Sequence, residues 1–167
     1  MEIIQDNSGS KPSGDLVPDS DLLIFLVQDV RIGIPAVMID HVFRMVAVTP
    51  LHEAPPGIIG IINYHGEIFP VFSFRNYFSL QNKSLSPKDY LLIVQSERSL
   101  AIIADYIEGV FNLSGEIIPP EKIDPGIQGI TGFYRCKDGL LVVTHPQDLI
   151  SLTDQKKIQA MKEFLAI

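Results

Sequence analysis

Three short aliphatic segments occur twice in this chain, in the same order and at nearly constant spacing. The pairs are 22–25 (LLIF) with 91–94 (LLIV), 39–43 (IDHVF) with 107–111 (IEGVF), and 57–61 (GIIGI) with 126–130 (GIQGI). Three matches in register favour an internal duplication over chance. A repeat of about 65 residues has a marginal core when it stands alone, so the two copies should pack against each other.

The segments within each repeat have the pattern of β-strands. Residues 22–27 and 30–34 are short apolar runs rich in β-branched side chains, and turn residues recur at short intervals. We therefore predict an all-β protein with two small five-stranded β-barrels packed together, because closure of a sheet removes its exposed edges. The first barrel should lie mainly in residues 21–82 and the second mainly in residues 88–152. Exchange of strands between the barrels remains open.

The two ends of the chain depart from this β pattern. Residues 1–20 are rich in Ser, Gly and Pro, which predicts a flexible tail. Residues 153–167 place Ile158, Met161 and Leu165 at helical spacing, which predicts a short C-terminal helix. The N-terminus lacks the pattern of a secretory signal, and no apolar run is long enough to span a bilayer. We therefore expect a cytoplasmic protein with no direct membrane insertion.

The segment 58–62 (IIGII) is more apolar than one barrel interior requires. Alternate side chains of a barrel strand face the interior, so its four isoleucines cannot all point inward. Some of them must face the sister barrel or another protein.

Side chains that could support catalysis are sparse. The four histidines show no metal-ligand spacing, Cys136 has no histidine near it in sequence, and no phosphate-binding or nucleophile motif is present. Asp105 and Glu108 should lie on opposite faces of a strand, which argues against shared acid–base chemistry. A net charge of −7 without a basic cluster argues against nucleic-acid binding. We therefore expect a binding protein, not an enzyme, with no metal site and no cofactor.

Residues 55–75 (PPGIIGIINYHGEIFPVFSFR) resemble the signature hairpin of the CheW-like chemotaxis adaptor family, and the resemblance covers nearly all of residues 21–152. It implies the two-barrel fold. It also implies an adaptor that couples the cytoplasmic tips of chemoreceptors (methyl-accepting proteins) to the regulatory domain of a CheA-type histidine kinase, in chemotaxis or surface-motility signalling. In that family, receptors dock in the groove between the barrels and the kinase docks on exposed barrel ends.

Two other functions stay open on sequence alone. The protein would then be a kinase-independent structural component of a receptor array, or a small-molecule binder that uses the groove between the barrels.

The partner-binding region is expected at ten positions. They are Ile39, His41, Phe43, Ile59, Asn63, Tyr64, His65, Gly66, Arg75 and Asp105. Relatives often carry a glutamate at the position of His41 and an arginine at that of His65. A pair of opposite charges is thus replaced by two side chains of a type that titrates near neutral pH. If the two rings lie close together, acidification should charge both and weaken assembly.

Overall fold

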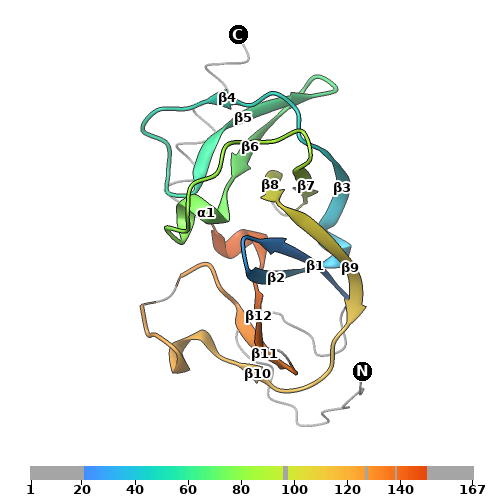
Figure 1. The fold of residues 1–167 in the computed structure, drawn as a ribbon, viewed down its shortest axis with the longest axis vertical. Helices are drawn as coiled ribbons and strands as arrows, with labels where there is room; N and C mark the ends of the chain where they lie inside the picture. The colour runs from blue at the N-terminus through green and yellow to red at the C-terminus, as the bar shows by residue number, and fades with distance from the viewer. Residues whose placement is uncertain (1–20, 96–97, 127, 138, 150–167) are drawn as a thin grey trace.

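The computed structural model describes residues 21–95, 98–126, 128–137 and 139–149, and these residues form two six-stranded β-sheets (Figure 1). The predicted tail at 1–20 and the predicted helix at 153–167 lie outside the described residues. Helical structure in the described part is limited to short turns. They are η1 (Ala36–Met38), α1 (Phe74–Tyr77), η2 (Pro120–Lys122) and η3 (Pro146–Leu149). The prediction of an all-β protein is confirmed.

The two sheets have equivalent strand orders. Sheet A has the order β10-β11-β12-β2-β1-β9, and sheet B, read in the corresponding direction, has the order β4-β5-β6-β8-β7-β3. The strands of sheet A are β1 (Asp21–Val27), β2 (Val30–Pro35), β9 (Tyr106–Asn112), β10 (Ile117–Ile118), β11 (Gly132–Cys136) and β12 (Gly139–Val143). Those of sheet B are β3 (Ile39–Arg44), β4 (Thr49–Pro50), β5 (Ile58–Tyr64), β6 (Glu67–Phe72), β7 (Tyr90–Val94) and β8 (Leu100–Ala104). Each sheet has one strand more than the predicted five, because a two-residue strand, β4 or β10, lies at one end.

Each sheet combines strands from both sequence repeats. Strands β1 and β2 begin the first repeat, yet they pair with β9 and β12 of the second. Strands β7 and β8 begin the second repeat, yet they pair with β3 and β6 of the first. Residues 21–35 therefore belong to the sheet that continues at 106–143, and residues 90–104 belong to the sheet that begins at 39–72.

Side chains from distant strands of the same sheet meet, so both sheets curl. In sheet B the ring of Phe43 on β3 stacks on that of Tyr64 on β5, with centroids 4.1 Å apart, although three strands separate β3 from β5. In sheet A, Phe111 and Ile117 come from the two end strands and pack against one buried cluster. Such contacts require the strong curvature of a small barrel.

The repeated strand β1 buries both of its faces. Leu22 and Ile24 point into the interior of sheet A, while Leu23 and Phe25 point into a core shared by the two sheets. This alternation explains why the strand is apolar from Leu22 to Val27, whereas a strand with one solvated face would alternate apolar with polar residues.

Strand β7 occupies the equivalent place in the second repeat and divides its side chains in the same way. Leu91 and Ile93 point into the interior of sheet B, while Leu92 and Val94 join the shared core. Both sheets and α1 supply fully buried members of the shared core. They include Phe25, Ile32, Ile34, Phe72, Phe74, Leu92, Val94 and Ile102.

The four isoleucines of β5 are divided in the same manner. Ile58 packs in the shared core and Ile62 in the interior of sheet B, Ile59 is half-buried against that interior, and Ile61 is buried as well. The register shifts between Ile58 and Gly60. A Cβ at Gly60 would lie 2.3 Å from the carbonyl oxygen of Thr49, so glycine allows the close approach of β4. The apolar excess is mostly covered by the protein itself.

Replacing Phe25 with Ala should lower the free energy of unfolding by about 3–5 kcal/mol, because the ring is fully buried between the two sheets. Urea titration followed by circular dichroism measures the effect. The exposed Leu140→Ala change is the control and should stay within about 0.5 kcal/mol of wild type. A small effect of Phe25→Ala would contradict the role given to the shared core.

Candidate docking surfaces

The β5–β6 hairpin ends in a two-residue turn formed by His65 and Gly66. Both residues have positive φ, 53° and 82° respectively, as in the type I′ turns whose twist suits antiparallel strands. The Asn63 Oδ1 atom accepts a hydrogen bond from the Gly66 backbone N–H at 3.0 Å. A Cβ at Gly66 would meet no atom within 4 Å, so the glycine serves the backbone angle and not a steric need.

Four aromatic or imidazole rings gather beside this turn, and we call His41, Phe43, Tyr64 and His65 the tip cluster. Phe43 stacks on Tyr64 with 6° between the ring planes. His65 meets Tyr64 edge-on at a centroid distance of 4.2 Å, and His41 does so at 6.1 Å. Both histidines therefore lie beside the same tyrosine, and the expected effect of acidification on assembly stays a prediction.

Acidic side chains lie beside the tip cluster. The His41 Nδ1 atom lies 3.0 Å from Asp40 Oδ2, and both side chains are about half exposed. The same oxygen of Asp40 accepts a hydrogen bond from Gln95 Nε2 at 3.3 Å. On the hairpin, Glu67 is the cross-strand partner of Tyr64. The tip of sheet B thus presents rings together with carboxylates.

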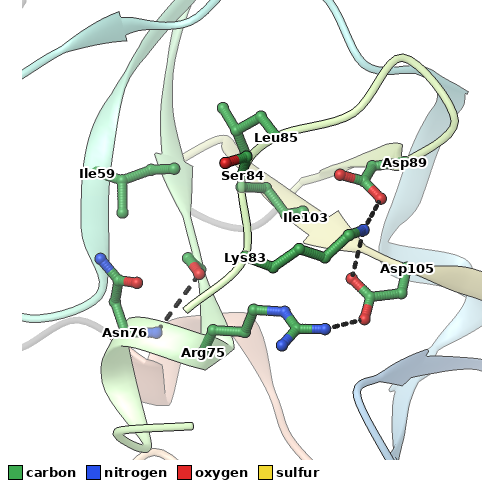
Figure 2. A pocket seen from close by; sticks show the side chains of 10 residues that line it. Ile59, Arg75, Asn76, Lys83, Ser84, Leu85, Asp89, Ile103 and Asp105 are labelled. Atoms are coloured by element: carbon green, nitrogen blue, oxygen red, sulfur yellow. Dashed lines mark hydrogen bonds and ion pairs between the residues drawn. The ribbon is translucent and has the colours of Figure 1, made fainter. Parts of the chain in front are cut away.

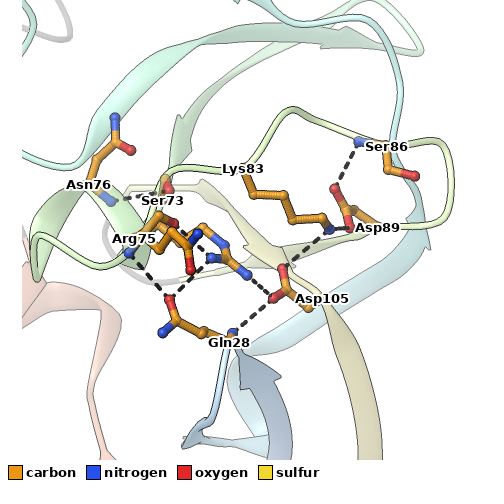
Figure 3. Close-up of polar contacts among 9 residues, drawn as sticks. Gln28, Ser73, Arg75, Asn76, Lys83, Ser86, Asp89 and Asp105 are labelled. Carbon is orange, nitrogen blue, oxygen red and sulfur yellow. Dashed lines mark hydrogen bonds and ion pairs between the residues drawn. The ribbon is translucent and has the colours of Figure 1, made fainter.

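Arg75 and Asp105 lie at the other end of β6, in a polar network of their own (Figure 3). The Arg75 Nη2 atom donates to Asp105 Oδ2, and its Nη1 atom donates to the carbonyl of Gln81 at 2.8 Å and to Gln28 Oε1 at 3.3 Å. The backbone N–H of Gln28 donates to Asp105 Oδ2 at 2.8 Å. The side chains of Arg75 and Asp105 are only 14% and 21% exposed, so most of their surface is withdrawn from water.

This network joins both sheets to the connection between the repeats. Gln28 lies in the turn between β1 and β2 of sheet A, Arg75 lies in α1 after β6 of sheet B, and Gln81 precedes β7. Lys83, in the same connection, pairs with the buried Asp89 and lies 3.8 Å from Asp105. The charged side chains therefore fix a long loop against the two sheets.

A hollow of about 260 Å³ opens beside the network (Figure 2). Its lining residues are Ile59, Ser73, Arg75, Asn76, Lys83, Ser84, Leu85, Asp89, Ile103 and Asp105. The two cations and two carboxylates in this lining pair with one another, Arg75 with Asp105 and Lys83 with Asp89. These four side chains are thus satisfied within the protein, as expected for a structural network and not for a charged-ligand site.

The ten residues expected to bind partners therefore fall in three places. The tip of sheet B holds His41, Phe43, Asn63, Tyr64, His65 and Gly66. Ile59, Arg75 and Asp105 line the hollow. Ile39 packs against the shared core.

Sequence reasoning named Arg75 and Asp105 but missed the other side chains of their network. No sequence motif includes Gln28, Lys83 or Asp89. The polar stretch that contains Lys83 indicates only a boundary between the repeats. Asp105 and Glu108 do not act together, since Glu108 accepts two hydrogen bonds from Arg31, at 3.0 and 3.1 Å. Among the described residues, no group of His, Cys, Asp or Glu could hold a metal ion. No helix in the same part of the chain is long and apolar enough to cross a membrane.

Comparison with known proteins gives a consistent result. Residues 21–154 match the family model of the CheW-like domain. Protein FrzA of Myxococcus xanthus is 28% identical over 105 residues, covering 62% of this chain and 66% of that protein. Chemotaxis protein CheW of Treponema pallidum is 26% identical over 145 residues, covering 82% and 85% of the two chains. Chemotaxis protein CheW of Klebsiella aerogenes is 24% identical over 146 residues, covering 85% and 87%.

A solved structure supports the fold. The scaffolding protein TtCheW from Thermoanaerobacter tengcongensis superposes with a TM-score of 0.64 at 22% sequence identity, and the match covers 75% of this chain and 88% of that one.

Replacing Arg75 with Ala should lower the free energy of unfolding by about 1–3 kcal/mol, because the largely buried Asp105 carboxylate loses a charged donor. Urea titration measures this loss, and the exposed Lys122→Ala change serves as the control. The double variant Arg75→Ala with Asp105→Asn should lose less than the sum of the two single changes. If the free-energy losses of the two single variants add up to that of the double variant, the two side chains are not coupled.

Proposed function

The chain belongs to the CheW-like family, and from that premise we propose that it is a non-catalytic signalling adaptor. It would couple the cytoplasmic tips of chemoreceptors to the regulatory domain of a CheA-type histidine kinase, in chemotaxis or surface-motility signalling. The observation that carries the proposal is the extent of the family match, since residues 21–154 include every described strand. The names of the relatives and of the solved scaffolding protein support the same role. With such partners, the protein would act in the cytoplasm.

The arrangement of polar and apolar side chains also supports an adaptor. The charged groups around the hollow neutralise one another, and the space between the sheets is filled by the shared core. A small molecule therefore finds little room between the sheets, which disfavours the ligand-binding alternative. The accessible features are rings at the tip of sheet B and aliphatic side chains at the margins of both sheets.

The proposed docking surface for the receptor includes two exposed valines. Val42 on β3 is paired with Leu92, and Val110 on β9 is paired with Leu23. Cross-strand partners share a face, and both leucines belong to the shared core, so the valines lie at the open margin of that core. They are 42% and 54% exposed, and their strands run along the same side of the molecule in Figure 1. An apolar receptor helix would cover them.

The adaptor should hold both partners at once. Full-length protein, mixed with the kinase regulatory domain and a receptor cytoplasmic fragment from the same organism, should elute with both in size-exclusion chromatography. Pairwise mixtures are the controls. Binding of the receptor without the kinase would favour the kinase-independent array component instead, and binding of neither would refute the proposal.

Val42→Asp and Val110→Asp should each weaken receptor binding by roughly tenfold, because a carboxylate replaces apolar contact surface at a loss of about 1.4 kcal/mol. Calorimetric titration with the receptor fragment measures the loss. Leu140→Asp is the matched control, since Leu140 on β12 is 45% exposed and lies away from this margin. Equal losses in all three variants would argue against a docking surface at the valines.

A further inference from the structure

The tip cluster is flanked by carboxylates on two sides. Glu67 is the antiparallel partner of Tyr64, so the two side chains stand on the same face of the hairpin. Asp40 lies beside His41, with 3.0 Å between the nearest oxygen and nitrogen. Glu67 is exposed and Asp40 is 43% exposed, so both charges can meet a partner.

The rings themselves form a fixed platform. Phe43 and Tyr64 are nearly parallel, and Tyr64 is only partly buried at the hairpin end. The faces of aromatic rings carry negative potential and attract ammonium and guanidinium groups. The protein uses this interaction within itself on the other face of β3, where the Arg44 guanidinium carbon lies 4.1 Å from the centre of the Tyr90 ring.

We propose that the tip cluster is a docking site for a cationic side chain, arginine or lysine, presented by a protein partner. The cation would lie against the rings of the tip cluster, with Asp40 and Glu67 as its counter-charges. The net charge of −7 would favour the approach of a basic segment. This inference rests on the proposed adaptor function, because the adaptor's partner supplies the cation.

An acidic segment fits this surface poorly. It would meet two carboxylates, and the nearest arginine along β3 is engaged elsewhere. Arg44 points to the opposite face of the strand, where it lies over Tyr90 and donates to the carbonyl of Lys88 at 2.6 Å. Charge complementarity therefore selects a cationic partner.

The test replaces Tyr64 in the full chain with phenylalanine and with its mono-, di- and trifluorinated forms. Each fluorine withdraws electron density from the ring face and changes the ring's shape little. Affinities are measured separately for the receptor cytoplasmic fragment and the kinase regulatory domain. For the partner that uses the tip, the dissociation constant should rise stepwise along the series, by about 3-fold to 30-fold in total. Glu67→Gln should weaken the same complex and reduce its dependence on salt.

Matched substitutions separate this effect from a general effect of fluorination. The same residues at Tyr106, which is 58% exposed on β9 and pairs with Leu26 outside the shared core, should leave both affinities unchanged. Thermal unfolding of each variant shows that the fold is retained. If wild type binds its partners and the fluorinated series at position 64 binds equally well, the cationic site is overturned and the adaptor function stands. If wild type binds neither partner, both proposals fall.

Discussion

Burial of both faces of strands β1 and β7 is the constraint on which the rest of the structure depends. A residue and its neighbour along β1 or β7 face two different cores, one inside the curled sheet and one between the sheets. Each barrel interior is small, and in the described part of the chain five buried side chains form that of sheet A. The larger shared core compensates, because apolar area removed from water is the main favourable term in folding. Each sheet alone would have a marginal core.

The duplication and the apolar strands could be recognised in the sequence because aliphatic side chains at fixed spacing report burial directly. Leu22 to Phe25 and Leu91 to Val94 match in type and also in the core that each position enters. The exchange of strands between repeats could not be derived in this way. Pairing of Ile32 with Val142 joins residues far apart in the chain, and local patterns contain no information on which strand lies beside which.

The candidate site, like the fold, could be predicted only in part from the sequence. The hairpin turn follows from Gly66, which favours left-handed backbone, and from Asn63, whose side chain accepts a hydrogen bond from the Gly66 N–H. The stacking of Phe43 on Tyr64 depends on the curvature of sheet B, a property of the whole sheet and not of either segment. No local pattern indicated that Gln28 and Lys83 join Asp105, because these side chains converge only in three dimensions. Residues whose role is to hold a loop in place leave no motif.

The exchange of strands has a consequence for synthesis on the ribosome. Sheet A needs β1 from the start of the chain and β12, which ends at Val143, near the end of the described part. The apolar side chains of β1 and β2 must therefore wait for their partner strands until residues up to Val143 have been made. Contacts this distant in sequence make folding slow. During the synthesis of residues 36–143 the nascent chain is exposed to misassociation, and sheet A is complete only when β12 has been made.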